Sequence, residues 1–120
     1  MNNQVYLGDD GFIHLDYKGE QNYQTAKADQ EPMDKLVRML HQQGKKAYIL
    51  VDATNVPKQD SGARKAAVEI VLSVPYDRVA LYGGSPFIRN VAGLIVKAVG
   101  KSHKFGFFAT REEAVKWLKS

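Results

Sequence analysis

The residues that could do chemistry in this chain are few and widely separated. No cysteine is present, which excludes disulfides, cysteine-bound zinc and thiol nucleophiles. The three histidines, His14, His41 and His103, share no metal-ligand spacing with one another or with a carboxylate. Neither a G-x-S-x-G nucleophile elbow nor a G-x-x-x-x-G-K-[ST] phosphate loop occurs. The sequence therefore predicts a protein that is not an enzyme and that holds no metal or cofactor.

The segment Asp60-Ser61-Gly62 lies at a junction between an apolar run, which ends at Asp52, and a helix rich in small residues. Such strand-to-helix junctions are where α/β proteins often bind ligands. Ser61, together with Asp60, is therefore a candidate regulatory or phosphorylation site. The alternative is that one of the two residues is simply the N-cap of the helix, a role worth about 1 kcal/mol.

A second junction of this kind carries Gly83, Gly84 and Ser85, in the segment "YGGSPF". A strand, two glycines and a helix N-terminus can form an anion site. Turn-forming glycines, Ser85 as N-cap and Pro86 at the first helical position also account for the segment. We retain Gly83, Gly84 and Ser85 as a candidate ligand or partner surface.

The helix predicted over residues 86–99 is apolar around most of its circumference. Packing on one sheet face requires only about a third of a helix surface to be apolar. Phe87, Val91 and Leu94 are therefore candidates for contact with a protein partner, a second copy in a homodimer, or an apolar, lipid-like ligand. Burial by the hairpin or the terminal helix of the same chain is the remaining alternative.

Length and composition indicate one domain spanning residues 1–120, because 120 residues suffice for one core and not for two. The net charge of +4 divides into −2 over residues 1–60 and +6 over residues 61–120. The basic side chains fall mostly on predicted helix surfaces without aromatic interleaving, which favours solvated faces over nucleic-acid binding. No signal-peptide profile and no apolar stretch of about 20 residues is present, so a cytoplasmic protein without a membrane span is expected.

The elements predicted along the chain have the order ββαβαβαβα. Residues 4–7 and 12–17 form a hairpin around the turn "GDDG", and the alternation in 12–17 predicts one buried face. The remaining predicted strands are 47–53, 78–83 and 104–109, and the predicted helices are 32–43, 61–74, 86–99 and 111–118. Pro32 suits a first helical turn, Gly44 a helix end, and Thr110 with Glu113 a capping box. Residues 18–30 are polar and carry no assignment. Strands alternating with helices predict an α/β fold with a mixed sheet.

Three segments carry a resemblance to a known family: "ILVDATNVPKQDSGARKAAVEIV", "YDRVALYGGSPFIRNVAGLIVKAVGK" and "FFATREEAVKWL". Along nearly its whole length the chain resembles the SpoIIAA-like group, also described as STAS/SEC14-type domains. The resemblance implies a mixed sheet with packed helices, no catalysis, and regulation through partners or ligands. In the anti-sigma-factor antagonists of the wider STAS group, a serine at a helix N-terminus after such a strand is phosphorylated by a partner kinase.

Ser61 occupies the place of that serine in Asp60-Ser61-Gly62. The second serine of the family pattern is missing, and Pro57-Lys58-Gln59 replaces the apolar residues that commonly precede the motif. The similarity to lipid-binding SEC14 domains implies an apolar ligand instead. We therefore expect a non-enzymatic regulatory or signalling domain of STAS type that binds a protein partner or a small ligand. A small carrier for a lipid or other apolar ligand is the alternative, and a dimerisation module is a third interpretation.

Overall fold

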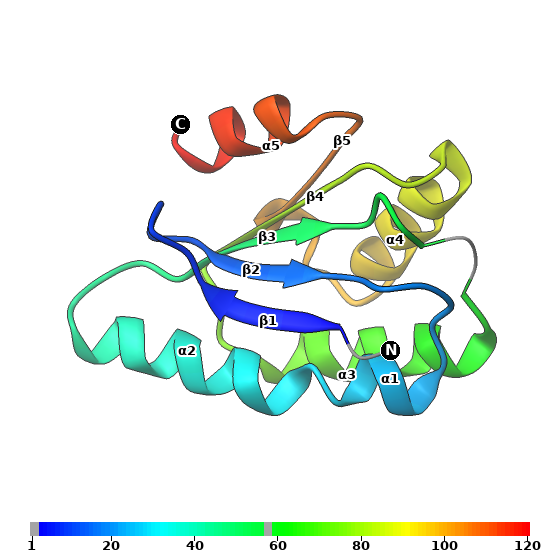
Figure 1. The fold of residues 1–120 in the computed structure, drawn as a ribbon, viewed down its shortest axis with the longest axis horizontal. Coiled ribbons are helices and arrows are strands. Elements are labelled where there is room, and N and C mark those ends of the chain that lie inside the picture. The colour runs from blue at the N-terminus through cyan, green and yellow to red at the C-terminus, as the bar shows by residue number, and fades with distance from the viewer. Residues whose placement is uncertain (1–2, 57–58) are drawn as a thin grey trace.

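The computed structural model describes residues 3–56 and 59–120 and contains a five-stranded sheet with strand order β1-β2-β3-β4-β5 (Figure 1). The strands are β1 (Gln4–Leu7), β2 (Ile13–Asp16), β3 (Tyr48–Asp52), β4 (Arg78–Tyr82) and β5 (Phe105–Phe108). The helices are α1 (Tyr23–Lys27), α2 (Gln30–Gln42), α3 (Ser61–Ser73), α4 (Pro86–Ala98), α5 (Arg111–Leu118) and a short 3-10 helix η1 (Ser102–Lys104). β1 pairs antiparallel with β2, and each later strand pair is parallel. The mixed α/β sheet opened by a hairpin is confirmed.

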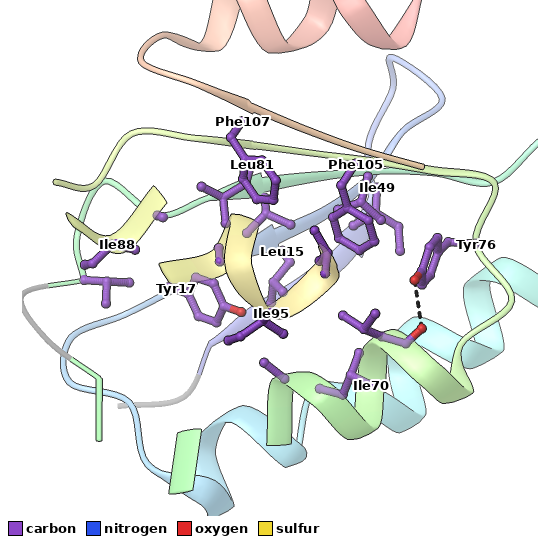
Figure 2. A pocket seen from close by; sticks show the side chains of 18 of the residues that line it. Leu15, Tyr17, Ile49, Ile70, Tyr76, Leu81, Ile88, Ile95, Phe105 and Phe107 are labelled. Carbon is purple, nitrogen blue, oxygen red and sulfur yellow. Dashed lines mark hydrogen bonds between the residues drawn. The ribbon is translucent and has the colours of Figure 1, made fainter. Parts of the chain in front are cut away.

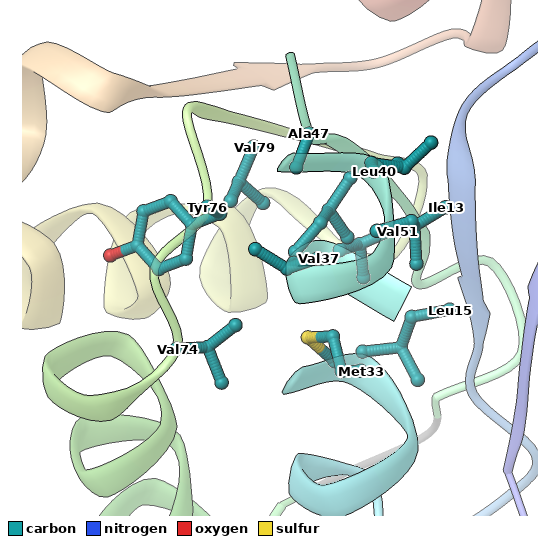
Figure 3. Packing of buried hydrophobic residues seen from close by; sticks show 11 residues of the cluster. Ile13, Leu15, Met33, Val37, Leu40, Ala47, Val51, Val74, Tyr76 and Val79 are labelled. Atoms are coloured by element: carbon teal, nitrogen blue, oxygen red, sulfur yellow. The ribbon is translucent and has the colours of Figure 1, made fainter. Parts of the chain in front are cut away.

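Helices cover both faces of the sheet (Figure 1): α5 lies over one face, and α2, α3 and α4 lie over the other. On the α5 side, Leu50 and Ala80 of the central strands pack against Ala114 and Leu118. On the opposite side, side chains of β2, β3 and β4 pack against α2, as Figure 3 shows. The members of this second cluster labelled in that view include Ile13, Leu15, Val51 and Val79 from the sheet and Met33, Val37 and Leu40 from α2.

The segment 12–17 differs from its prediction, because β2 is buried on both faces and not on one. The alternation predicts one buried face, yet Ile13 and His14, which point to opposite faces of the sheet, are only 0% and 6% exposed. The Tyr6 ring stacks on the imidazole at 4.9 Å, and His14 Nε2 lies 2.9 Å from Asp10 Oδ2. Phe12, on the same face, packs in the cluster beneath α5. Because its ring is hydrogen-bonded to Asp10 and stacked on Tyr6, His14 can be buried although it is polar.

Residues 18–30, unassigned from the sequence, contain the short helix α1 and the first residue of α2. A capping box starts α1: the Thr25 N–H donates to Asn22 Oδ1 at 2.9 Å, and the Asn22 N–H donates to Thr25 Oγ1 at 3.0 Å. The predicted order ββαβαβαβα therefore lacked one helix, because five residues are too few to show a helical apolar stripe. Pro32 lies in the first turn of α2, and Gly44 ends that helix with a φ of 75°, both as expected.

Candidate functional site

The N-terminus of α3 follows directly from Asp60. The backbone of Asp60 is extended, and its Oδ1 accepts a hydrogen bond from the Ala63 N–H at 2.8 Å, so Asp60 is the N-cap. Ser61 is the first helical residue and is exposed. Arg64 and Lys65, also exposed, stand three and four positions further along the helix. Their side chains therefore lie on the same helix surface as Ser61.

The short helix α1 fixes the position of α3. Gly62 lies so close to α1 that a Cβ at this position would stand 3.1 Å from Tyr23 Cβ. The Tyr23 hydroxyl donates to Glu69 Oε1 at 2.7 Å, and Lys27 Nζ lies 3.0 Å from the same oxygen. Glycine at 62 thus permits the contact that holds the Ser61 end of α3 against the segment after β2.

The loop between β4 and α4 uses most of its polar groups internally. Gly83 and Gly84 both have positive φ, 77° and 69°, and a Cβ at Gly83 would lie 2.5 Å from Thr54 Oγ1. Arg89 Nη1 donates to the carbonyl oxygens of Gly83 and Gly84 at 3.1 and 2.9 Å. Ser85 Oγ accepts from the Ile88 N–H at 3.2 Å, as predicted for an N-cap. Glycine is therefore required at these positions because the turn needs a positive φ and because the backbone at Gly83 lies close to Thr54, in the loop after β3.

The outward side of α4 carries large apolar residues that nothing in the described chain covers. The exposed fractions of Phe87 and Leu94 are 67% and 68%. They stand seven positions apart, which places them on one helix face, with the half-buried Val91 between them. Ile88 and Val96 are buried on the opposite side of the helix. We call Phe87, Val91 and Leu94 the α4 outer face.

A cavity lies between the sheet and the inner sides of α3 and α4, with a volume of about 110 Å³ (Figure 2). Leu15, Ile49 and Leu81 form part of its sheet wall, and Phe107 extends this wall onto β5. Its helical walls include Ile70 and Val71 from α3 and Ala92 and Ile95 from α4. The cavity is lined by the inner side of α4, and the candidate residues Phe87, Val91 and Leu94 do not belong to its lining.

Three lining residues of this cavity have polar side chains: Tyr17, Gln59 and Tyr76. The Tyr76 hydroxyl donates to the Val71 carbonyl oxygen at 2.8 Å, the bond drawn in Figure 2. The Tyr17 hydroxyl makes no hydrogen bond to any residue in 3–56 or 59–120, and it points toward α4 near Ile95 (Figure 2). Burial raises the pKa of this hydroxyl, and the negative charge of Asp29 raises it further. The hydroxyl therefore stays protonated at neutral pH and can donate.

The structure places the candidate residues in two groups, Asp60 and Ser61 at the start of α3 and the others in α4 and the loop before it. Both α3 and α4 begin beyond the carboxyl ends of parallel strands, on the same side of the molecule (Figure 1). The α4 outer face points away from the cavity that the inner side of the same helix lines. Pro57 and Lys58, where the family pattern departs, lie outside the described residues. The sequence did not indicate Tyr17 as a site residue. Tyr17 is the last residue of the alternating segment 12–17, and no other pattern distinguishes it.

The histidines that the structure pairs are each bound to one carboxylate. His41 Nε2 lies 2.8 Å from Asp77 Oδ2, an oxygen that also accepts from the Ala47 N–H at 2.7 Å. Burial would raise the pKa of Asp77, but these hydrogen bonds outweigh it and hold the pKa below its usual value.

Within residues 3–56 and 59–120, no group of three or more histidines and carboxylates could hold a metal ion. The same residues contain no helix with the length and apolar character needed to cross a bilayer.

Comparison with known proteins places the chain in a family without an assigned activity. The family described as "Domain of unknown function (DUF7793)" matches residues 6–120. The chain belongs to this family. No curated protein matches the sequence.

Two solved structures share the fold of this DUF7793 domain. One is an uncharacterised protein from the DUF3478 family of Shewanella loihica PV-4 with a SpoIIAA-like fold, at TM-score 0.68 and 15% identity, covering 97% of this chain and 91% of the other. The second is the anti-sigma factor antagonist SpoIIAA in its unphosphorylated form, at TM-score 0.62 and 15% identity, covering 98% of both chains. The predicted SpoIIAA-like fold is therefore confirmed. Identity at this level shows the fold alone.

Proposed function

We propose that residues 1–120 form one non-enzymatic regulatory domain that binds a protein partner through the α4 outer face, with the N-terminus of α3, on the same side of the molecule, as a second contact. The observation that carries the proposal is the exposure of Phe87 and Leu94, about two thirds each, on one side of a helix. Large apolar side chains gathered on a surface mark protein interaction sites. The fold shared with an anti-sigma factor antagonist supports a regulatory role without catalysis.

The charge around this surface supports a partner with acidic residues. Lys97 is exposed one turn beyond Leu94, and Arg64 and Lys65 are exposed in the first turns of α3. A partner that inserts an apolar anchor beside Leu94 and surrounds it with carboxylates would match both properties.

Ser61 is the candidate switch of this surface. Its side chain is exposed, at the first position of α3, where free backbone N–H groups and the helix dipole favour an anion. Arg64 and Lys65 could pair with a phosphate there, whereas the Asp60 carboxylate would oppose it. A phosphate would also reverse the local charge that an acidic partner recognises, so we expect modification to weaken the complex.

Site-specific photo-cross-linking in the protein's own cells tests this proposal. A benzophenone amino acid replaces Phe87 or Leu94 in separate variants, and the matched control carries it at Lys116, exposed on α5 at the opposite side of the sheet. We expect one discrete protein adduct from positions 87 and 94 that is absent from position 116. Ser61→Asp should reduce the yield of this adduct severalfold, and Ser61→Ala should leave it unchanged.

Two results would contradict the proposal. Equal products from position 116 would show that the α4 outer face has no special role. An adduct whose mass is twice that of this chain would show that the occupant is a second copy and not a different protein.

A second candidate function, the binding of a small apolar molecule, is favoured by the cavity between the sheet and α3 and α4. An apolar cavity of about 150 Å³ is large enough to bind benzene. The volume of about 110 Å³ is somewhat smaller, so it suits a molecule no larger than about one benzene ring and is too small to enclose a lipid chain. This narrows the carrier function expected from the sequence to ligands of that size.

A further inference from the structure

The lining of the cavity is apolar apart from Tyr17, Gln59 and Tyr76, and the hydroxyl of Tyr17 points toward α4 (Figure 2). No fully buried polar side-chain atom in the described residues lacks a hydrogen-bond partner. The Tyr17 hydroxyl makes no hydrogen bond to those residues, and Figure 2 shows it directed into the space beside Ile95. A hydroxyl in such surroundings gains a hydrogen bond when an acceptor enters the cavity.

Tyr76, in the wall of the same cavity, shows the contrasting arrangement. Its hydroxyl is already committed to the Val71 carbonyl oxygen at 2.8 Å. The protein thus satisfies one tyrosine within its own chain and leaves the other without a partner among the described residues. Ligand sites commonly combine an apolar wall with a small number of placed polar groups, as found here.

The charge near Tyr17 limits the kind of acceptor that fits. The buried carboxylate of Asp29 acts on the Tyr17 hydroxyl, and Asp29 is only 4% exposed. An anionic ligand would meet this negative charge in an apolar setting, where repulsion is poorly screened. A neutral oxygen acceptor, such as a carbonyl or hydroxyl group, avoids that repulsion.

We infer that the cavity is a binding site for a small neutral molecule, about the size of one benzene ring, whose oxygen accepts a hydrogen bond from Tyr17. This assignment rests on the second function proposed above and adds the chemistry of its ligand. The apolar wall from Leu15, Leu81 and Ile95 holds the hydrocarbon part, and Tyr17 selects the oxygen.

Methyl-detected NMR titration with phenol, toluene and benzoate tests the inference. Phenol and toluene have nearly the same shape but differ in the oxygen, and benzoate adds a charge. Shifts at the Ile88 and Ile95 methyl groups would locate binding in the cavity, whose α4 wall contains both residues. We expect phenol to bind about fivefold more tightly than toluene, which corresponds to one ordinary hydrogen bond. Benzoate should bind more weakly than either.

Two tyrosine variants test which hydroxyl group gives the preference for phenol over toluene. Tyr17→Phe should bring phenol down to the affinity of toluene and leave toluene unchanged, and its melting temperature without ligand should stay within a degree or two of the wild type. Tyr76→Phe is the matched control: it should lower the melting temperature, because it removes an internal bond, but keep the preference for phenol.

Equal binding of phenol and toluene in the wild type would overturn the role of Tyr17 while leaving apolar binding intact. Absence of binding by both probes would overturn the second proposed function together with this inference. A loss of the phenol preference in Tyr76→Phe, with Tyr17→Phe unchanged, would also overturn the assignment.

Discussion

At the scale of single residues, a buried polar cluster ties the beginning of the described chain to the start of α2. Asn3 Nδ2 donates to Asp29 Oδ2 at 2.9 Å and to Gln21 Oε1 at 2.8 Å. Asn3 Oδ1 in turn accepts from the Lys18 N–H at 2.9 Å. Burial raises the pKa of the Asp29 carboxyl to about 6, although the bond from Asn3 acts in the opposite direction. Ionisation of Asp29 at neutral pH therefore lowers the stability of the folded protein.

Asp29 predicts a specific dependence of stability on pH. Because its pKa is about 6 in the folded protein against 3.8 ordinarily, the native state binds the proton more tightly, and stability falls as pH rises from about 4 to about 6.5. Asp29→Asn, which keeps an acceptor for Asn3, should raise the free energy of unfolding by about 1–3 kcal/mol at pH 8. At pH 4 it should have little effect.

Urea denaturation of the variant and the wild type at both pH values measures this difference. Asp9→Asn, on the exposed hairpin turn, is the control and should change stability little at either pH. An equal change for Asp29→Asn at pH 4 and pH 8 would contradict the argument.

Residue roles of this kind are hard to predict from the sequence. Asp29 and Tyr17 lie in or beside the polar stretch 18–30, where neither periodicity nor a motif indicates burial. Their surroundings come from residues distant in sequence, since Tyr17 packs against Ala53 and Ile88 and Asp29 accepts a hydrogen bond from Asn3. The cavity has the same origin, because its walls come from strands and helices that are distant in sequence.

At the scale of elements, local chemistry determined most boundaries. Ser85 with Pro86 and Thr110 each begin a helix where predicted, because these residue types satisfy free N–H groups or need none. The capping box at Thr110 takes a modified form, since the Thr110 hydroxyl donates to Glu113 Oε1 at 3.0 Å. For α3 the sequence left the N-cap open between Asp60 and Ser61, because both residue types are good caps.

The N-cap of α3 can be tested by three substitutions. Asp60→Ala should lower the free energy of unfolding by about 1 kcal/mol, because the Ala63 N–H loses its acceptor. Asp60→Asn should retain most of the stability, since asparagine is an equally good cap. Ser61→Ala should lie within about 0.5 kcal/mol of the wild type. Chemical denaturation ranks the variants, and a larger loss for Ser61→Ala than for Asp60→Ala would refute the assignment of Asp60.

At the scale of the whole molecule, the fold was predictable because strands alternate with helices and each central strand is apolar apart from one charged residue at its end. The distribution of exposed apolar surface was predictable only in part. The excess of apolar residues in the 86–99 helix is divided between two uses, since Ile88, Ala92 and Ile95 line the cavity and Phe87 and Leu94 face outward. The sequence shows that this helix has more apolar residues than packing on the sheet requires. Only the structure shows which of them line the cavity and which are exposed.

The charge of the whole molecule bears on whether the α4 outer face meets a second copy. A symmetric dimer through Phe87 and Leu94 would bring together two chains that each carry a net charge of +4, with the exposed Lys97 of each copy one turn from Leu94. We therefore expect the isolated chain to be monomeric in light scattering at low ionic strength, where this repulsion is least screened. Any self-association should appear only at high salt and should be lost in Leu94→Glu, which places a charge at the centre of the face. A dimer at low salt that Leu94→Glu converts to a soluble monomer would show that apolar contact outweighs the repulsion, and that the partner of this face is another copy of the chain.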